Sequence, residues 1–190
     1  MNSFSENITA LGPVIVSKEV EIVAINNSQI IFMGDNYLFP HSRFMAEGQA
    51  NTIVIGKRTR VQIRSMVMGD VVIGSDTIIA PDVFISSGTH LHDMEPNLPI
   101  NEQDCLSSVL FGDYSDPVII GSNVWIGRLT TVMPGRRIGN NSIVAANSVV
   151  TQDIPSNEIW GGIPCKKIAS RNVTSNKTRL NFFHSKYYLS

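Results

Sequence analysis

An aliphatic residue recurs at every sixth position in two long runs of this 190-residue chain. An α-helix repeats near 3.6 residues and a β-strand near 2, so a strict period of six requires the chain to turn a corner every six residues. Such a period indicates a hexapeptide β-helix, in which short parallel strands wind around a narrow apolar shaft. Small residues follow most of these positions, which lets the chain turn without a collision. The first run is Ile55, Val61, Val67, Ile73, Ile79 and Ile85, and the second is Ile120, Ile126, Val132, Ile138, Val144 and Val150.

The repeat divides the chain into three segments. Residues 1–50 carry β-rich pieces without a clean period of six, and they are either irregular first coils or a separate cap on the end of the solenoid. We expect residues 51–155 to form the β-helix, because Pro155 ends the repeat. Within it the period fails over residues 91–117, which are rich in Pro, Asp and Asn and are expected to leave the shaft as a loop. Residues 156–190 are expected to form a further loop and a C-terminal tail.

The composition of the chain limits which binding partners and which cellular compartment we expect. The formal net charge of −1 gives no electrostatic reason to expect a nucleic acid. No stretch approaches the roughly 18 apolar residues of a membrane span, and the N-terminus lacks the features of a signal peptide. The 2 cysteines are too few for a disulfide framework and lack metal-ligand spacing. We therefore expect a soluble cytoplasmic protein with no nucleic-acid partner and no membrane span.

Residues 117–168 carry the segments VWIG, MPG, IGNNSIVAANSVVTQDIP and GGIPCK. They resemble the C-terminal half of the hexapeptide acyltransferases. The segment SSGTHLHDMEPNLPIN resembles the active-site stretch of the bacterial sugar and polysaccharide O-acetyltransferases in this superfamily. The fold implied is all-β, a left-handed parallel β-helix with an extruded active-site loop and a C-terminal tail. Parallel crossovers are right-handed in about 98% of cases, so the left hand is expected from the resemblance alone. Members of the family are typically homotrimers that bind acetyl-CoA between adjacent shafts.

The resemblance implies that His90 is the catalytic general base, because THLHD matches the Thr-His-x-x-Asp form of the family motif. An alcohol is a poor nucleophile until its proton is leaving, and imidazole is suited to take that proton at neutral pH. His92 is the alternative base and is otherwise assigned to the substrate side. Asp93 either orients the imidazole or binds substrate, or it caps a turn of the loop. Asn101 matches the family's Ile-Asn landmark, either at the substrate or as a residue that stabilises the loop.

Trp125 directly precedes the inward-facing Ile126 and is therefore expected to point out of the shaft. An outward tryptophan on a solenoid face favours a cleft or a subunit contact. In several resembling enzymes the corresponding tryptophan lies at the acetyl-CoA site, where its indole N–H can donate to the thioester oxygen. The resemblance thus implies a catalytic role for Trp125, and packing between subunits is the alternative.

The acetyl-CoA side is also assigned by the resemblance. Ala146 and Thr151 correspond to residues that line the pantetheine arm in the family. Gln152 stands where a lysine commonly binds the phosphates, so Lys166 and Lys167 are the alternative source of positive charge. The residues assigned to the cofactor are Gly127, Arg128, Ala146, Thr151, Gln152, Lys166 and Lys167. An ordinary solvated surface is the alternative for each basic residue.

These features predict an acetyl-CoA-dependent O-acetyltransferase. Its acceptor is a hydroxyl of a sugar or of a bacterial surface polysaccharide or its precursor. Transfer is direct, with His90 as the base and a backbone N–H or Trp125 stabilising the oxyanion. The donor arrives activated, so no metal is expected, and the repeat holds no third histidine for one. The alternatives are N-acetylation of an amino sugar, O-acetylation of an antibiotic, and a catalytically inactive β-helix scaffold.

Overall fold

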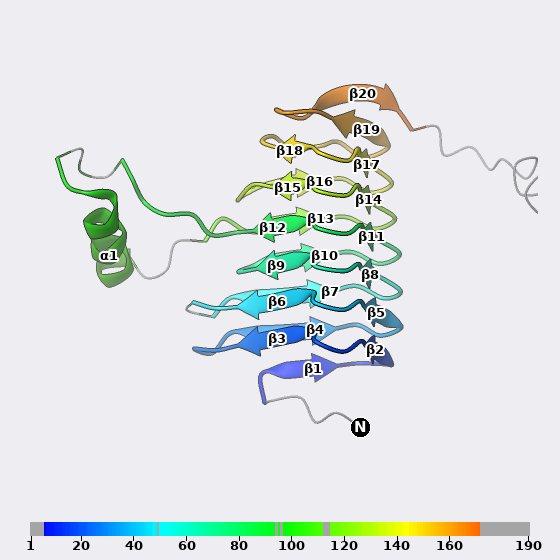
Figure 1. Ribbon diagram of the computed structural model, residues 1–190, viewed down its shortest axis with the longest axis horizontal. Coiled ribbons are helices and arrows are strands. Elements are labelled where there is room, and N and C mark those ends of the chain that lie inside the picture. Colours follow the sequence, from blue (N-terminus) through cyan, green and yellow to red (C-terminus); the bar gives the residue numbers. More distant parts are fainter. Residues whose placement is uncertain (1–5, 49, 94, 96, 112–114, 172–190) are drawn as a thin grey trace, which may run out of the picture.

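The computed structural model describes residues 6–48, 50–93, 95, 97–111 and 115–171, and it shows a β-solenoid (Figure 1). Three parallel sheets form its sides, and the chain climbs from sheet A to sheet B to sheet C as a left-handed coil. Sheet A contains β1 (Ile8–Ala10), β4 (Gln29–Phe32), β7 (Thr52–Ile55), β10 (Val71–Ile73), β13 (Val118–Ile120) and β16 (Arg137–Ile138). Sheet B contains β2 (Val14–Val16), β5 (Asn36–Leu38), β8 (Arg60–Val61), β11 (Ile78–Ile79), β14 (Trp125–Ile126), β17 (Ile143–Val144), β19 (Glu158–Gly161) and β20 (Lys166–Ser170). Sheet C contains β3 (Glu21–Ala24), β6 (Arg43–Ala46), β9 (Met66–Met68), β12 (Phe84–Ser86), β15 (Thr131–Val132) and β18 (Val149–Val150).

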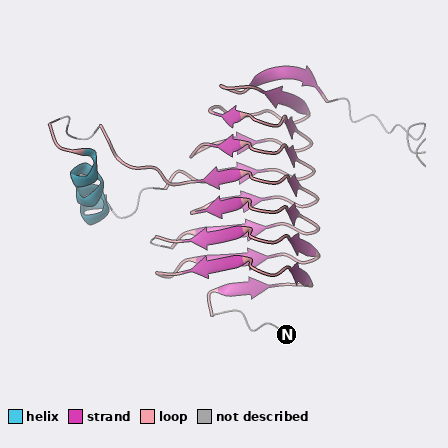
Figure 2. Cartoon of the chain, in the orientation of Figure 1, coloured by secondary structure: helices cyan, strands magenta, loops and turns pink. Residues whose placement is uncertain are grey.

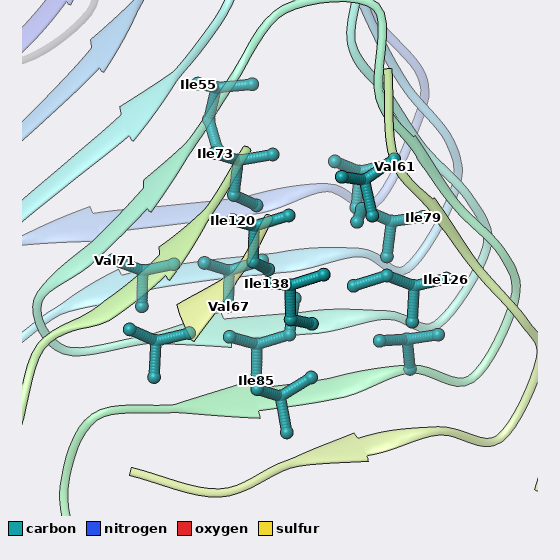
Figure 3. Packing of buried hydrophobic residues seen from close by; sticks show 14 of the residues in the cluster. Ile55, Val61, Val67, Val71, Ile73, Ile79, Ile85, Ile120, Ile126 and Ile138 are labelled. Carbon is teal, nitrogen blue, oxygen red and sulfur yellow. The ribbon is translucent and has the colours of Figure 1, made fainter. Parts of the chain in front are cut away.

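The hexad residues fill the shaft in vertical columns. All twelve are at most 2% exposed, and each stacks on its equivalent in the neighbouring coil. Figure 3 shows one such column, in which Ile55, Ile73, Ile120 and Ile138 lie one above another. Burying an aliphatic side chain of this size stabilises a fold by about 1.5–3 kcal/mol. The predicted left-handed β-helix is confirmed.

One corner of the solenoid accounts for the breaks in the period. In a regular coil the paired residues are 18 positions apart, as with Ile53 and Val71. Ile30 pairs with Ile53 at a separation of 23 positions, and Val71 pairs with Val118 at 47. The additional residues lie between a strand of sheet C and the next strand of sheet A. The extra chain therefore gathers along a single edge, on the left in Figure 1.

The segment before residue 51 continues the three sheets. Strands β1 to β6 pair in parallel with one another and with β7, β8 and β9. The sequence left open irregular coils or a cap for this segment, and its strands form coils lengthened at the corner. The division of the chain into three segments stays a prediction. At the other end, β20 pairs antiparallel with β19, and residues 172–190 of the predicted tail lie outside the described residues.

The segment 91–117 leaves the shaft, as the broken period predicts, and it contains a helix that the sequence did not reveal. Helix α1 (Ile100–Phe111) is the single helix of the described residues and stands apart from the solenoid (Figure 2). Its Ile100 and Leu106 are 58% and 41% exposed, so these two residues do not form a buried apolar stripe in the part of the helix whose side chains are described. Within the described ranges, no helix has the length and the apolar character needed to cross a membrane.

Candidate active site

The extruded segment begins and ends at a closed neck. The backbone N–H of Asp116 donates to the carbonyl of Ser87 at 2.8 Å, and the hydroxyl oxygens of Ser87 and Ser115 lie 2.7 Å apart. The Ser87 hydroxyl also accepts from the backbone N–H of Asp70 at 2.7 Å. These bonds hold the chain where it leaves sheet C and where it returns to sheet A. His90 follows directly after this fixed neck.

The imidazole of His90 is held by a carboxylate from α1. His90 Nδ1 lies 2.8 Å from Asp104 Oδ2, and the backbone N–H of Leu91 donates to Asp104 Oδ1 at 3.3 Å. The hydrogen bond from His90 lowers the pKa of Asp104, so this carboxyl group stays ionised at neutral pH. An ionised carboxylate only accepts hydrogen bonds, so the tautomer of His90 that satisfies this contact carries its proton on Nδ1. The lone pair of Nε2 is then free to take a proton.

Sequence reasoning missed Asp104. It named Asp93 as the acid able to orient the imidazole, whereas the carboxylate at His90 belongs to Asp104. Asp93 is an exposed residue of the segment between His90 and α1. Only a predicted helix over residues 100–111 could have indicated that a residue fourteen positions along the chain returns to His90.

The other loop residues lie close to His90 in sequence and have different contacts. His92 Nδ1 lies 3.1 Å from the backbone oxygen of His90, so its partner is a neutral carbonyl. Asn101 is exposed in the first turn of α1, three residues before Asp104. The buried side chain of Gln103 donates to the carbonyl of Leu98 at 2.8 Å and fixes the start of the helix. The loop is thus ordered around the residue that carries the carboxylate.

Trp125 lies on a different side of the solenoid from His90. It projects outward from β14 in sheet B, is 51% exposed, and pairs in register with Ile78 and Ile143. His90 lies at the corner between sheets C and A, which is the edge opposite sheet B (Figure 1). Within one chain these two side chains therefore do not share a site.

Three of the residues assigned to the cofactor lie at the corner between sheets B and C. Gly127 is buried beneath the next coil, and a Cβ there would lie 2.8 Å from Ala146 Cα. Arg128 Nε donates to Asp82 Oδ2 at 2.9 Å and so reaches back to the preceding coil. Ala146 is exposed. The packing of the coils explains Gly127 and Arg128 without a ligand, whereas Ala146 is open to one.

The remaining assigned residues lie elsewhere. Thr151 and Gln152 follow β18 at the corner that carries His90, two coils further along, and Gln152 Nε2 donates to the carbonyl of Cys165 at 3.1 Å. Lys167 Nζ lies 2.6 Å from Glu158 Oε1. Lys166 on β20 is exposed and forms no ion pair with the described part of the chain. One chain therefore brings Thr151 and His90 to one edge but separates them from Gly127, Arg128 and Ala146.

A cavity of about 580 Å³ opens beside His90, against the outer face of sheet C. It extends toward the N-terminal coils, and Thr151 lies on the opposite, C-terminal side of His90. No group of three His, Cys, Asp or Glu residues within the described ranges is placed to hold a metal ion. The arrangement offers one exposed imidazole that lines a cavity, with a carboxylate bound to its Nδ1. This arrangement suits the removal of a proton from a bound hydroxyl or amine.

The sequence of this chain matches a known protein family. Residues 52–87 and 117–152 match the family described as bacterial transferase hexapeptide (six repeats). The chain is similar to the galactoside O-acetyltransferase of Escherichia coli, with 35% identity over 64% of the chain and 56% of that enzyme. It spans roughly half to three fifths of the length of the curated relatives that it matches.

Two solved structures extend the comparison. One is a hexapeptide-repeat acetyltransferase of Vibrio cholerae in complex with acetyl-CoA, with a TM-score of 0.59 and 26% identity over 75% of this chain and 71% of that one. The other is the polySia-specific acetyltransferase NeuO, with a TM-score of 0.59 and 25% identity over 95% of this chain and 94% of that one.

Proposed function

Since the chain belongs to the hexapeptide-repeat acyltransferase superfamily, we propose that it transfers an acetyl group from acetyl-CoA to a hydroxyl of a sugar. The sugar is free or part of a bacterial surface polysaccharide or its precursor. The observation that carries the proposal is the His90–Asp104 pair at the mouth of the extruded loop. A scaffold has no need for an imidazole with one nitrogen bound to a carboxylate and the other free.

The proposed reaction uses His90 twice. Nε2 takes the proton of the acceptor hydroxyl while the hydroxyl oxygen forms a bond to the thioester carbon. The carbon–sulfur bond then breaks, and the imidazolium returns the proton to the departing thiolate of coenzyme A. Asp104 holds the ring and stabilises its charged form between these two steps. Protons and electron pairs balance without a metal or a covalent enzyme intermediate.

His90 is preferred to His92 as the base for two reasons. Its Nδ1 partner is a carboxylate, which stabilises an imidazolium, whereas the partner of His92 is a neutral carbonyl. His90 also lines the cavity at the base of the loop. His92, Asp93 and Asn101 are then close enough in the chain to contact an acceptor or to support the loop.

The site is completed between copies of the chain in this proposal. Trp125 and His90 lie on opposite sides of one solenoid, so a shared site requires a neighbouring copy. The outer face of sheet B also exposes Ile15, Tyr37 and Ile78 in the register column of Trp125, with the exposed Arg60 between Tyr37 and Ile78. Such exposed apolar side chains favour a protein contact. We therefore propose a homotrimer in which acetyl-CoA lies between two shafts, against Thr151 of one copy and Ala146 of the next.

Charge for the phosphates of coenzyme A comes from Lys166 in this arrangement. Lys167 is paired with Glu158, Arg128 with Asp82, and Gln152 with a backbone carbonyl. We place the reaction in the cytoplasm, where the free thiols of Cys105 and Cys165 stay reduced.

Thiol release from acetyl-CoA tests the proposal. The purified chain is incubated with acetyl-CoA and a panel of sugars, oligosaccharides, amino sugars and chloramphenicol, and free thiol is followed with a reactive dye. We expect release that depends on a sugar, and a product whose acetyl group is removed by alkaline hydroxylamine, as an ester is and an amide is not. Thiol release only with an amino sugar, or only with chloramphenicol, would show that the acceptor is an amino sugar or an antibiotic and not the hydroxyl of a neutral sugar. If no acceptor in the panel supports thiol release and calorimetry detects no binding of acetyl-CoA, the result would favour a catalytically inactive scaffold.

A further inference from the structure

The cavity beside His90 is built by the lengthened coils that precede the loop. Its wall is the outer face of β6, β9 and β12. Part of its rim comes from Glu47 and Asn51, which lie at the corner where the paired residues of neighbouring coils are more than 18 positions apart. The volume of about 580 Å³ falls within the range of about 300–1,000 Å³ that is usual for ligand sites. The same extra residues that interrupt the hexapeptide period thus help to form a concave surface beside His90.

The wall of this cavity is apolar. Met45 and Met68 are paired in register on adjacent coils, and both are partly exposed. Phe84 lies on the next strand, β12, where it pairs in register with Met66, and it is 40% exposed, whereas Ser86 is the residue paired with Met68. A solvent-facing phenyl ring that lines the same cavity as two thioethers offers a surface against which the carbon-bound hydrogens of a pyranose ring can pack.

The rim of the cavity is polar. The side-chain amide of Asn51 donates to the backbone oxygen of Glu47, so the two rim residues are joined. The side chain of Glu47 is exposed, and its carboxylate is a hydrogen-bond acceptor for hydroxyl groups. His90 lines the cavity at the same corner of the solenoid, two coils further along than Glu47. A ring that lies on the apolar wall can therefore direct hydroxyls both to Glu47 and to His90.

The charge of the cavity discriminates between acceptors. Among the described residues that line it, Glu47 carries a negative charge and no lysine or arginine is present. A carboxylated or phosphorylated sugar would bring a second negative charge without a cation to balance it.

From these observations we propose that the cavity is the acceptor site and that it takes a neutral pyranoside. Met45, Met68 and Phe84 contact the face of the sugar ring, Glu47 accepts hydrogen bonds from its hydroxyls, and one hydroxyl points to His90. The inference rests on the proposed acetyl transfer and narrows its acceptor. It also separates this chain from NeuO, whose name specifies polysialic acid.

The test compares variants of the cavity at saturating acetyl-CoA. Initial rates of thiol release are measured with methyl galactoside and with galacturonic acid. We expect Phe84→Ala and Met68→Ala each to raise the KM for methyl galactoside roughly 5- to 10-fold and to leave the KM for acetyl-CoA unchanged. The control is Val72→Ala, which removes an outward side chain of similar exposure, 39%, from sheet A.

Glu47→Lys tests the charge argument directly. It should lower kcat/KM for methyl galactoside and raise it for galacturonic acid at least tenfold. Wild-type activity with galacturonic acid and none with methyl galactoside would overturn the neutral acceptor while leaving acetyl transfer intact. An unchanged acceptor KM in Phe84→Ala, Met68→Ala and Glu47→Lys, all folded by circular dichroism, would overturn the site. Absence of thiol release with every acceptor would instead contradict the proposed function.

Discussion

A substitution at Gly127 distinguishes a role of this residue in coil packing from a role in binding acetyl-CoA. A Cβ at this position would lie 2.7 Å from the carbonyl carbon of Ala145 and 2.8 Å from the Cα of Ala146. Both atoms belong to the backbone of the next coil, which cannot rotate away as a side chain could. The change Gly127→Ala must therefore push two stacked coils apart.

The cost follows from the rigidity of the shaft. Overpacking a well-packed core by a methylene typically costs about 1–3 kcal/mol. For a chain of this length, 1 kcal/mol corresponds to a shift in Tm of about 2–4 °C. We therefore expect Gly127→Ala to lower the Tm by roughly 2–12 °C.

The assay is a thermal melt by circular dichroism at one fixed protein concentration, because association also shifts Tm. Gly88→Ala is the matched control, since a Cβ there meets nothing closer than Ser86 Oγ at 4.0 Å. Its Tm should stay within about 1 °C of wild type, as is usual for exposed positions without strain. A Gly127→Ala protein with an unchanged Tm and a raised KM for acetyl-CoA would refute the packing role and support the assignment of Gly127 to the cofactor.

Three further predictions concern the carboxylates and a buried hydroxyl. The pKa of Glu158 is lowered by its bond to Lys167, so its stabilising effect is complete above the unfolded pKa near ~4.3 and is lost as pH falls through the lower folded value. The Tm of Glu158→Gln should thus lie below wild type at pH 7 and converge with it below about pH 4 in thermal melts. Thr77 is fully buried and its hydroxyl donates to a carbonyl at 3.0 Å, so Thr77→Val should cost about 1–3 kcal/mol in urea unfolding, and an unchanged midpoint would contradict that bond. Asp104→Asn should lower kcat/KM for the acceptor about tenfold and leave the KM for acetyl-CoA unchanged, and Asp104→Glu should restore part of the loss. The expected loss is modest because the His90 side chain is largely exposed, so solvent screens its interaction with the carboxylate. Equal losses in Asp104→Asn and Asp104→Glu would indicate that the residue only stabilises the loop.

The fold was predictable where the sequence keeps its period. Each aliphatic residue at a hexad position lies in the shaft because one position per side of the coil faces inward. The first coils could not be predicted in this way, since five extra residues at one corner shift the phase between Phe44 and Ile55 while both side chains remain buried. Insertions of that kind leave the shaft intact and remove only its sequence signature.

The candidate site was predictable only in part. The end of the first run and the family motif both point to His90, and the structure places this residue at the mouth of the loop. Its partner Asp104 lies on α1, whose Ile100 and Leu106 are exposed, so these residues gave no signal of a packed helix that returns to His90. The separation of Trp125 from His90 could not be predicted either, because it depends on which side of the solenoid each residue occupies.

The most direct test of this account compares thiol release from acetyl-CoA in the wild type, His90→Ala and His92→Ala with one active sugar acceptor. A general base typically contributes about 10²- to 10⁴-fold to the rate. We expect the rate of thiol release to fall by that factor in His90→Ala and to stay within a few fold of wild type in His92→Ala. A His90→Ala protein that folds and transfers acetyl at the wild-type rate would contradict this account.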